Sequence, residues 1–316
     1  MATRLFAAPS PHIHGGEKTR RIMLDVILAL IPALAVSTYV LGWRVLFITA
    51  VAVVGCLVFE YLISRFLLKR GSTIGDLSAI VTGMLLAFNL PAGIPWWIVL
   101  VGALVAIGIG KMTFGGLGCN PFNPALTGRI FLLIAYPVQM TDWTTGVPDA
   151  LSGSTLLADV KYNTSLLSEV DFLQMLGGHM NGSMGEIGAL ALILGGLYLL
   201  WRKVITWHIP VAFIGTTFLF TLAVEGGNLE TTLAWVLSGG LILGACFMAT
   251  DYVTRPITRN GQYLFGIFLG VMTGIFRIFG PSAEGVSYAI IIGNLLVPLI
   301  EKITIPKPFG KGGEKA

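Results

Sequence analysis

Charged side chains are scarce in this sequence. They make up 11% of its 316 residues, whereas hydrophobic residues make up 55%. A soluble globular domain carries about 25% charged residues, so the composition excludes one. Several apolar segments approach the length of about 20 residues that a helix needs to cross the hydrocarbon of a bilayer. We therefore predict an all-α integral membrane protein.

Cysteine is scarce too. Cys56, Cys119 and Cys246 lie in apolar context without CxxC spacing or an even count, which argues against a disulfide framework and favours buried free thiols. A metal site built from Cys119 and Cys246 would lack the four ligands of a cluster site, unless another subunit supplied the rest. The sequence also lacks a nicotinamide-binding fingerprint and a soluble domain, so we do not expect an isolated redox enzyme.

Ten apolar segments are candidate membrane spans. The first runs into Trp43 and Arg44 and not into a small-residue cleavage site, so we expect it to be a retained span and not a signal peptide. The predicted spans are 22–41, 45–68, 74–90, 95–110, 125–138, 184–201, 208–224, 232–250, 261–279 and 285–300.

The basic residues orient these spans. Lys and Arg are retained preferentially on the cytoplasmic side. With a cytoplasmic N-terminus, all of the 20 basic residues except Arg44, Lys161 and Arg277 fall at that face, and this placement says more about partners than the net charge of +4 does. The predicted organisation is a cytoplasmic segment (1–21), a first five-helix repeat (22–138), an extracytoplasmic loop (139–183), a second five-helix repeat (184–300) and a cytoplasmic basic tail (301–316).

Five spans in each half predict an inverted repeat. An odd number per half inserts the second half upside down relative to the first, as in inverted-repeat transporters. Two registers of the repeat remain open, defined either by Gly83 with Gly244 and Phe114-Gly115 with Phe279-Gly280, or by Gly83 with Gly215, Phe88 with Phe220 and Pro124 with Pro256.

Irregular segments interrupt both halves. The segment 111–129 contains four glycines and two prolines, and 246–261 and 279–288 are also irregular. At membrane depth such backbone predicts broken or re-entrant half-helices, which mark ligand or ion sites. Asn123-Pro124-Ala125 resembles the aquaporin signature, but one copy is present where two are required, and Leu126 stands where that signature has Arg.

Five charged residues lie in the spans or at their ends. Charge there costs a few kcal/mol and marks a pathway or a partner, although near a helix end the side chain also reaches the headgroups. The two deeper residues are expected in a structural or functional ion pair. The five are Asp25, Asp76 and Asp251 near the ends, and Glu60 and Arg277 deeper.

The loop 139–183 contains the motif Asp149-Ala150-Leu151-Ser152-Gly153-Ser154-Thr155. It resembles the Asp-x-x-Ser/Thr-Gly-Ala-Thr signature at which a flavin transferase attaches FMN, through its phosphate, to a threonine hydroxyl. An isolated Ser-Gly-Ser-Thr is more often an ordinary turn. The spacing of Asp149, the extracytoplasmic placement and the span architecture favour the flavin site, although Ser154 stands where the signature usually has Ala.

With ten spans and the segments GGLGCNPFNPA and FMATDYVTRP, the whole chain resembles the family that contains the D subunit of the Rnf electron-transport complex and the B subunit of the sodium-pumping NADH:quinone reductase. The short cytoplasmic lead makes the Rnf protein the closer match. The resemblance implies covalent FMN on Thr155, with Asp149, Ser152, Gly153 and Ser154 as the attachment motif, and it allows riboflavin in the membrane bundle. Arg277 is a candidate partner for the FMN phosphodiester.

The implied function is that of a membrane subunit of a redox-driven translocase in the bacterial inner membrane, coupling electron transfer to Na⁺ or H⁺ movement. The implied partners are a second covalent-flavin subunit, iron-sulfur subunits, the flavin transferase and the lipid bilayer, with no nucleic acid. The alternative is a channel or transporter for a small polar solute such as urea, whose inverted five-helix repeat this architecture also resembles. The Thr155 loop separates the two hypotheses.

Overall fold

The computed structural model describes residues 19–69, 73–143, 182–280 and 285–306. Every regular element in these ranges is a helix, and none of these residues lies in a strand. The prediction of an all-α fold is confirmed for this part of the chain. We call the helices before residue 144 the first half and those after residue 181 the second half.

The first half begins with two long helices and continues with shorter ones. Its elements are α1 (Thr19–Leu41), α2 (Arg44–Leu62), the π-turns η1 (Ile63–Leu67) and η3 (Val105–Met112), the 3₁₀ turn η2 (Ile74–Asp76), α3 (Ser78–Phe88), α4 (Trp96–Leu104), α5 (Pro124–Ala135) and α6 (Pro137–Met140). The π-turns continue α2 and α4 without a gap.

The second half ends with two long helices. Its elements are α9 (Ala189–Trp201), α10 (His208–Val224), α11 (Leu229–Leu237), α12 (Leu241–Leu243), the π-turn η5 (Gly244–Met248), α13 (Arg259–Phe279) and α14 (Val286–Thr304). α11 is followed by a break at Ser238–Gly240, and the chain bends by 59° there. Gly239 and Gly240 make this break possible, because both have positive φ (70° and 65°).

Four helices in the described ranges are long and apolar enough to cross a membrane. They are Thr19–Leu41, Arg44–Leu67, Arg259–Phe279 and Val286–Thr304, and the bent pair formed by α11 with α12 and η5 makes a fifth. Leu24, Leu28 and Ile31 expose about 45% of their surface along one face of α1, as lipid contact requires. The chain is therefore a multi-pass membrane protein.

Each of the ten predicted spans overlaps a helix, but several of these helices are too short to be identified as membrane crossings by length alone. Five apolar helices have only 10–17 residues: Ser78–Phe88, Trp96–Met112, Pro124–Ala135, Ala189–Trp201 and His208–Val224. The count of ten crossings thus stays a prediction. The predicted irregular backbone is confirmed within 111–129 and 246–261, because the chain is non-helical at 113–123 and 249–258. The third predicted segment, 279–288, lies partly outside the described residues.

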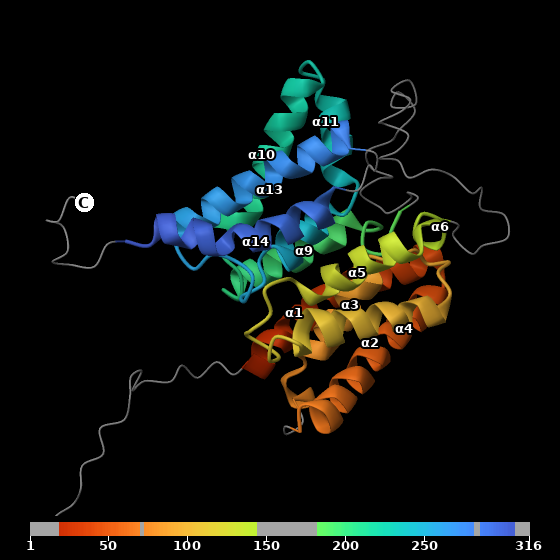
Figure 1. Cartoon of the computed structure of the whole chain (residues 1–316). Helices are drawn as coiled ribbons and strands as arrows, with labels where there is room; N and C mark the ends of the chain where they lie inside the picture. Colours follow the sequence, from red (N-terminus) through yellow and green to blue (C-terminus); the bar gives the residue numbers. More distant parts are fainter. Residues whose placement is uncertain (1–18, 70–72, 144–181, 281–284, 307–316) are drawn as a thin grey trace, which may run out of the picture.

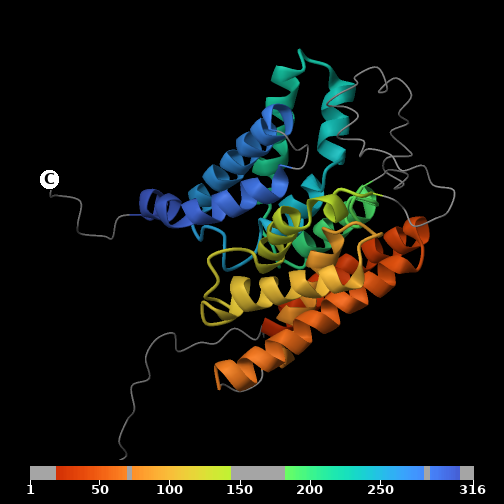
Figure 2. The same cartoon turned by 45° about the vertical axis from the view of Figure 1, so that its right-hand side comes forward.

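The two halves lie side by side, with the first half below the second in Figure 1 and again in the turned view of Figure 2. Within the halves, α2 packs on α3 and α4, and α10 packs on α11 and α13. Between them, α1 packs on α9 and α5 on α14. α1 begins and α14 ends toward the left of Figure 1.

Small residues let the helices approach closely. On α13, Gly266, Gly270 and Gly274 form a ridge at i, i+4 spacing that faces α10. A Cβ on Gly270 would lie 2.6 Å from Thr216 Cβ and 2.9 Å from the Phe213 carbonyl oxygen. Such ridges are typical of membrane helices, whose association depends on close packing and not on the hydrophobic effect.

Candidate functional site

The predicted flavin-attachment residues Asp149, Ser152, Gly153, Ser154 and Thr155 lie outside the described residues. The attachment motif therefore stays a prediction from the sequence. The described residues do contain several buried polar groups, some within one half and others at the contact between the halves.

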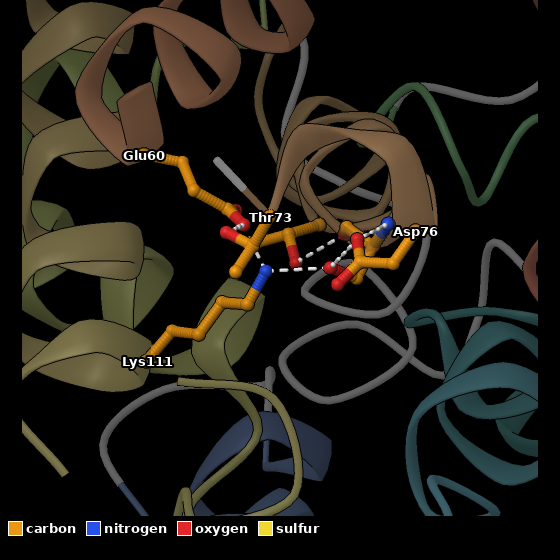
Figure 3. A network of polar contacts seen from close by, with 6 residues as sticks. Glu60, Thr73, Asp76 and Lys111 are labelled. Carbon is orange, nitrogen blue, oxygen red and sulfur yellow. Dashed lines mark hydrogen bonds and ion pairs between the residues drawn. The ribbon is translucent and has the colours of Figure 1, made fainter. Parts of the chain in front are cut away.

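A network around Glu60 and Lys111 is the first of these groups (Figure 3). Lys111 Nζ donates to Glu60 Oε2 and to Ser78 Oγ, each at 2.6 Å. Thr73 Oγ1 donates to the other carboxylate oxygen of Glu60 at 2.6 Å, and Asp76 Oδ1 accepts from Ser78 N at 2.9 Å and Ser78 Oγ at 2.6 Å. The network thus joins α2, η3 and the start of α3.

Burial makes it costly to leave either charge of this network without its partner. Glu60 and Lys111 are 0% and 2% exposed, so each charge depends on the other and on the hydroxyls around them. Two carboxylates and one ammonium group share the network. The sequence analysis identified Glu60 and Asp76 but missed Lys111, which it counted only as a cytoplasmic basic residue. The signal that could have found it was a lysine at the end of an otherwise apolar segment.

Arg277 is the second group, and it contacts backbone. Its guanidinium donates to the carbonyls of Trp235, Ser238 and Gly239, the last two at 3.0 Å. The side chain is 0% exposed. This arrangement does not support the predicted contact with a flavin phosphate, because Arg277 would have to release these carbonyl oxygens in order to bind a phosphate. The contact stays a prediction.

A third group crosses between the halves. The Asn123 side chain caps α5 by accepting from Ala125 N and Leu126 N, at 3.1 and 3.4 Å, and donates to the Met248 carbonyl of the second half at 3.3 Å. The Asn-Pro-Ala motif is thus a helix cap with Pro124 in the first turn. It also ties α5 to the end of η5.

Arg129 makes another contact between the halves. Its Nη1 donates to Asn89 Oδ1 at 2.8 Å and to Ser287 Oγ at 2.7 Å, and the residue is 5% exposed. The sequence prediction placed Arg129 at the cytoplasmic face. The membrane side stays a prediction, and the structure adds that Arg129 is buried within α5, where Asn89 and Ser287 accept from its guanidinium.

Asp25 joins α1 to α9. Tyr198 Oη donates to Asp25 Oδ1 at 3.0 Å, and Arg202 Nη2 lies 3.2 Å from Asp25 Oδ2. At the other end of α1, Ser37 Oγ contacts the Met184 and Ile187 carbonyls. The ion pairs of Asp25 and Glu60 are therefore with Arg202 and Lys111, neither of which sequence reasoning had paired with them.

A cavity of about 80 Å³ lies between these contacts, with walls from both halves. Its polar lining includes Thr82, Asn120 and Asn123 from the first half and Thr250 and Asp251 from the second. Polar groups from both halves thus face this cavity, which has room for water or a small ion.

Asp251 lies in the connection between η5 and α13. Burial raises the pKa of its carboxyl above the usual value, while bonds from the Val253 backbone and the Thr254 hydroxyl and the charge of Arg255 act in the opposite direction. Thr254 Oγ1 lies 3.3 Å from Asp251 Oδ2. The carboxylate is therefore held by its own loop and is only partly exposed.

The cysteines are separate in space. Cys56 in α2 and Cys246 in η5 are buried, whereas Cys119 in the loop 113–123 is exposed. Within the described ranges, no three His, Cys, Asp or Glu side chains come together as a metal site would require. The expectation of buried free thiols is confirmed for Cys56 and Cys246, whereas Cys119 is free but exposed, so the expected burial is wrong there.

Comparison with known proteins gives the relationship of the whole chain. Residues 6–310 match the family described as "NQR2, RnfD, RnfE family". The chain is 44% identical to the D subunit of the "Na(+)-translocating ferredoxin:NAD(+) oxidoreductase complex" of Acetobacterium woodii, with 97% of this chain and 95% of that protein covered.

Two further relatives agree over similar lengths. The D subunit of the "Proton-translocating ferredoxin:NAD(+) oxidoreductase complex" of Clostridium ljungdahlii is 39% identical, covering 95% of each chain. The D subunit of the "Ion-translocating oxidoreductase complex" of Salmonella paratyphi A is 37% identical, covering 96% of this chain and 97% of that protein. Because the match extends over nearly the full length, the chain belongs to the NQR2, RnfD, RnfE family.

Proposed function

We propose that this chain is the D-type membrane subunit of an Rnf-type complex, which couples electron transfer to the translocation of Na⁺ or H⁺. The observation that carries the proposal is the near-complete match to relatives named as the D subunits of ion-translocating oxidoreductase complexes. One of these relatives is named for Na⁺ and another for protons, so both ions belong to the proposal.

The electron-transfer role is proposed to depend on FMN joined to Thr155 by a phosphoester bond to the side-chain oxygen. Gly153 and the small residues around Thr155 leave room for a flavin transferase to deliver the group, and Asp149 serves recognition by that enzyme. Bound FMN supplies one- and two-electron redox chemistry. Riboflavin in the bundle is also part of the proposal, with no residues of the bundle assigned to it.

The partners follow from what the chain itself lacks. The described residues contain no cluster of cysteines, so iron-sulfur centres belong to other subunits in this proposal. A second covalent-flavin subunit exchanges electrons with FMN on Thr155, and the flavin transferase acts during maturation. The exposed apolar faces contact the lipid bilayer of the bacterial inner membrane.

We further propose ten crossings in two inverted five-helix repeats, with both termini cytoplasmic. Two features support this arrangement. The contacts of α2 with α4 have a counterpart in those of α10 with α13. The break at Leu77, which has φ 66°, lies six residues before Gly83, and the break at Ser238 lies six residues before Gly244. This spacing favours the register that pairs Gly83 with Gly244.

Flavin attachment is the test of the function. The chain is co-expressed with the flavin transferase, separated by denaturing electrophoresis and imaged for flavin fluorescence. We expect a fluorescent band from the unaltered chain and none from Thr155→Val. Intact-mass measurement of the same samples gives the mass of the attached group.

The control variants are Ser154→Ala and Thr164→Val, in the same loop. Ser154→Ala restores the residue that is usual in the signature and is expected to keep the band, and Thr164→Val removes a threonine outside the motif. A native complex without flavin on this chain would contradict the redox role and favour the alternative, a channel or transporter for a small polar solute such as urea.

A further inference from the structure

Two buried cations occupy corresponding places in the two halves. Lys111 is one residue before the end of η3, which continues α4. Arg277 is two residues before the end of α13. The segment α4 with η3 is the fourth apolar helix from α1, and α13 is the fourth from α9 when the bent pair counts as one helix. The two side chains are 2% and 0% exposed.

Each cation reaches an irregular point of the backbone next to the third helix of its half: the left-handed Leu77 before α3, or the break between α11 and α12. Lys111 Nζ donates to the hydroxyl of Ser78, the first residue of α3, which follows the left-handed Leu77. Arg277 donates to the carbonyls of Ser238 and Gly239, which form the break between α11 and α12. Both contacts lie at the point where the backbone leaves helical geometry.

The two cations contact opposite kinds of helix end. The start of a helix has a partial positive charge, which disfavours a cation, and at α3 the carboxylates of Asp76 and Glu60 offset this beside Lys111 and Ser78. The end of a helix has unpaired carbonyls and a partial negative charge. The planar fork of Arg277 binds those carbonyls directly.

The segments after the two breaks are also held at their far ends, in each case by the other half. At the end of α3, Gly185 N donates to the Phe88 carbonyl at 2.7 Å, and Met184 N donates to the Leu90 carbonyl at 3.2 Å. At the end of η5, Asn123 Nδ2 donates to the Met248 carbonyl. Each segment is thus held at one end by a cation of its own half and at the other end by the opposite half.

We infer that Lys111 and Arg277 are positioning residues, that Lys111 clamps the start of α3 and Arg277 the break between α11 and α12, and that together they set the width of the cavity between the halves. The walls of this cavity include Thr82 and Leu85 of α3 and Cys246 and Phe247 of η5. Releasing a clamp lets the adjoining wall move while the rest of the bundle stays folded. This role does not depend on the proposed flavin.

The native cysteines report on the two clamps separately. Cys246 lies in η5, after the break held by Arg277. Cys56 lies on α2 one turn before Glu60, the partner of Lys111. Both thiols are buried, and the exposed Cys119 serves as the internal standard. The experiment treats the purified full chain in detergent micelles with a maleimide and measures the labelling rate of each cysteine by peptide mass spectrometry.

We expect Arg277→Met to raise the labelling rate of Cys246 about tenfold or more relative to Cys119 and to leave Cys56 slow, as local opening requires. Lys111→Met is expected to speed Cys56 and to leave Cys246 slow. Arg277→Lys is expected to give an intermediate rate at Cys246, because one ammonium group cannot reproduce the fork. Lys111→Arg is expected to stay near the unaltered rate, since it keeps a cation beside Glu60.

A double variant separates clamping from charge balance. Glu60→Gln with Lys111→Met removes the uncompensated carboxylate but leaves Ser78 without its donor, and Cys56 is expected to stay fast. A return to the slow rate would mean that Lys111 only neutralises Glu60, which would overturn its role as a clamp.

If the methionine variants do not fold, the conservative variants Arg277→Lys and Lys111→Arg test the two clamping roles. An unchanged Cys246 rate in Arg277→Lys would overturn the role of Arg277. Equal acceleration of Cys56 and Cys246 by a single-site variant would overturn the proposal as a whole, because it would indicate general loosening of the bundle.

Discussion

Individual buried polar residues in this protein connect elements that are distant in the sequence. Asp25 meets Arg202, 177 residues away, and Asn123 meets Met248, 125 residues away. In lipid there is no hydrophobic driving force between helices, and each such hydrogen bond contributes only about 0.6–2 kcal/mol to their association. Their value lies in fixing which helix faces which.

Asn123 allows this contribution to be measured. Asn123→Ala removes both the cap of α5 and the bond to Met248, whereas Asn228→Ala removes only the exposed cap of α11. A lost cap costs about 1 kcal/mol, and a lost buried hydrogen bond costs about 1 kcal/mol more. We therefore expect the free energy of unfolding, measured with denaturant in detergent micelles, to fall further in Asn123→Ala.

Equal losses in the two alanine variants would contradict the bond to Met248. The comparison is matched because both residues are asparagines that accept from two backbone N–H groups at a helix start. They differ in burial and in the contact with the other half.

The residues themselves were easier to predict than their partners. Glu60 stood out because a carboxylate in an apolar segment requires an explanation, and the structure confirms an ion pair there. Its partner Lys111 could not be predicted, because the pairing depends on how α2 and η3 pack in three dimensions. Arg277 stood out in the same way, yet its partners are backbone carbonyls, which no sequence pattern identifies.

At the scale of elements, breaks were predicted better than boundaries. Glycine and proline predicted irregular backbone within 111–129, and the structure has it at 113–123, where Gly115, Gly116 and Gly118 have positive φ. The break at Ser238–Gly240 was not predicted, although Ser238-Gly239-Gly240 interrupts the apolar segment 232–250 and is a turn signal. The π-turns were not predicted either, since hydropathy does not distinguish them from α-helix.

The glycine ridge of α13 gives a prediction at this scale. Gly270→Val places methyl groups against Thr216 and the Phe213 carbonyl, and overpacking of this kind costs about 1–3 kcal/mol. Gly215→Val, on the partner helix α10, is the control, because a Cβ there meets nothing within 4 Å. We expect the thermal unfolding temperature in micelles to fall in Gly270→Val and to change little in Gly215→Val.

The outcome that would contradict this packing is an equal response of the two valine variants. Both place a β-branched side chain in a membrane helix, so the effect on helix propensity cancels. The remaining difference reports on the contact between α10 and α13.

At the scale of the whole molecule, the open question is how many times the chain crosses the membrane. Helix length supports four crossings, or five with the bent pair, whereas the basic residues favour ten. Short helices do not exclude a crossing when π-turns and irregular backbone extend them inside protein, as η3 extends α4 to Met112. The sidedness of one connection distinguishes the schemes.

That connection lies between α10 and α11. With a cytoplasmic N-terminus, ten crossings place Glu230 outside the cell, whereas four or five place it inside, because α3 to α10 then do not cross.

Glu230 is exposed at the start of α11, so Glu230→Cys provides a label site. Native Cys119, exposed in the loop 113–123, provides the cytoplasmic reference. We expect a membrane-impermeant maleimide to label Glu230→Cys in spheroplasts, where the outer face of the inner membrane is accessible, and to label Cys119 only after the membrane is permeabilised. Labelling of both residues only after permeabilisation would rule out ten crossings and with them the inverted repeat, because two five-helix halves of opposite orientation require α10 to end outside.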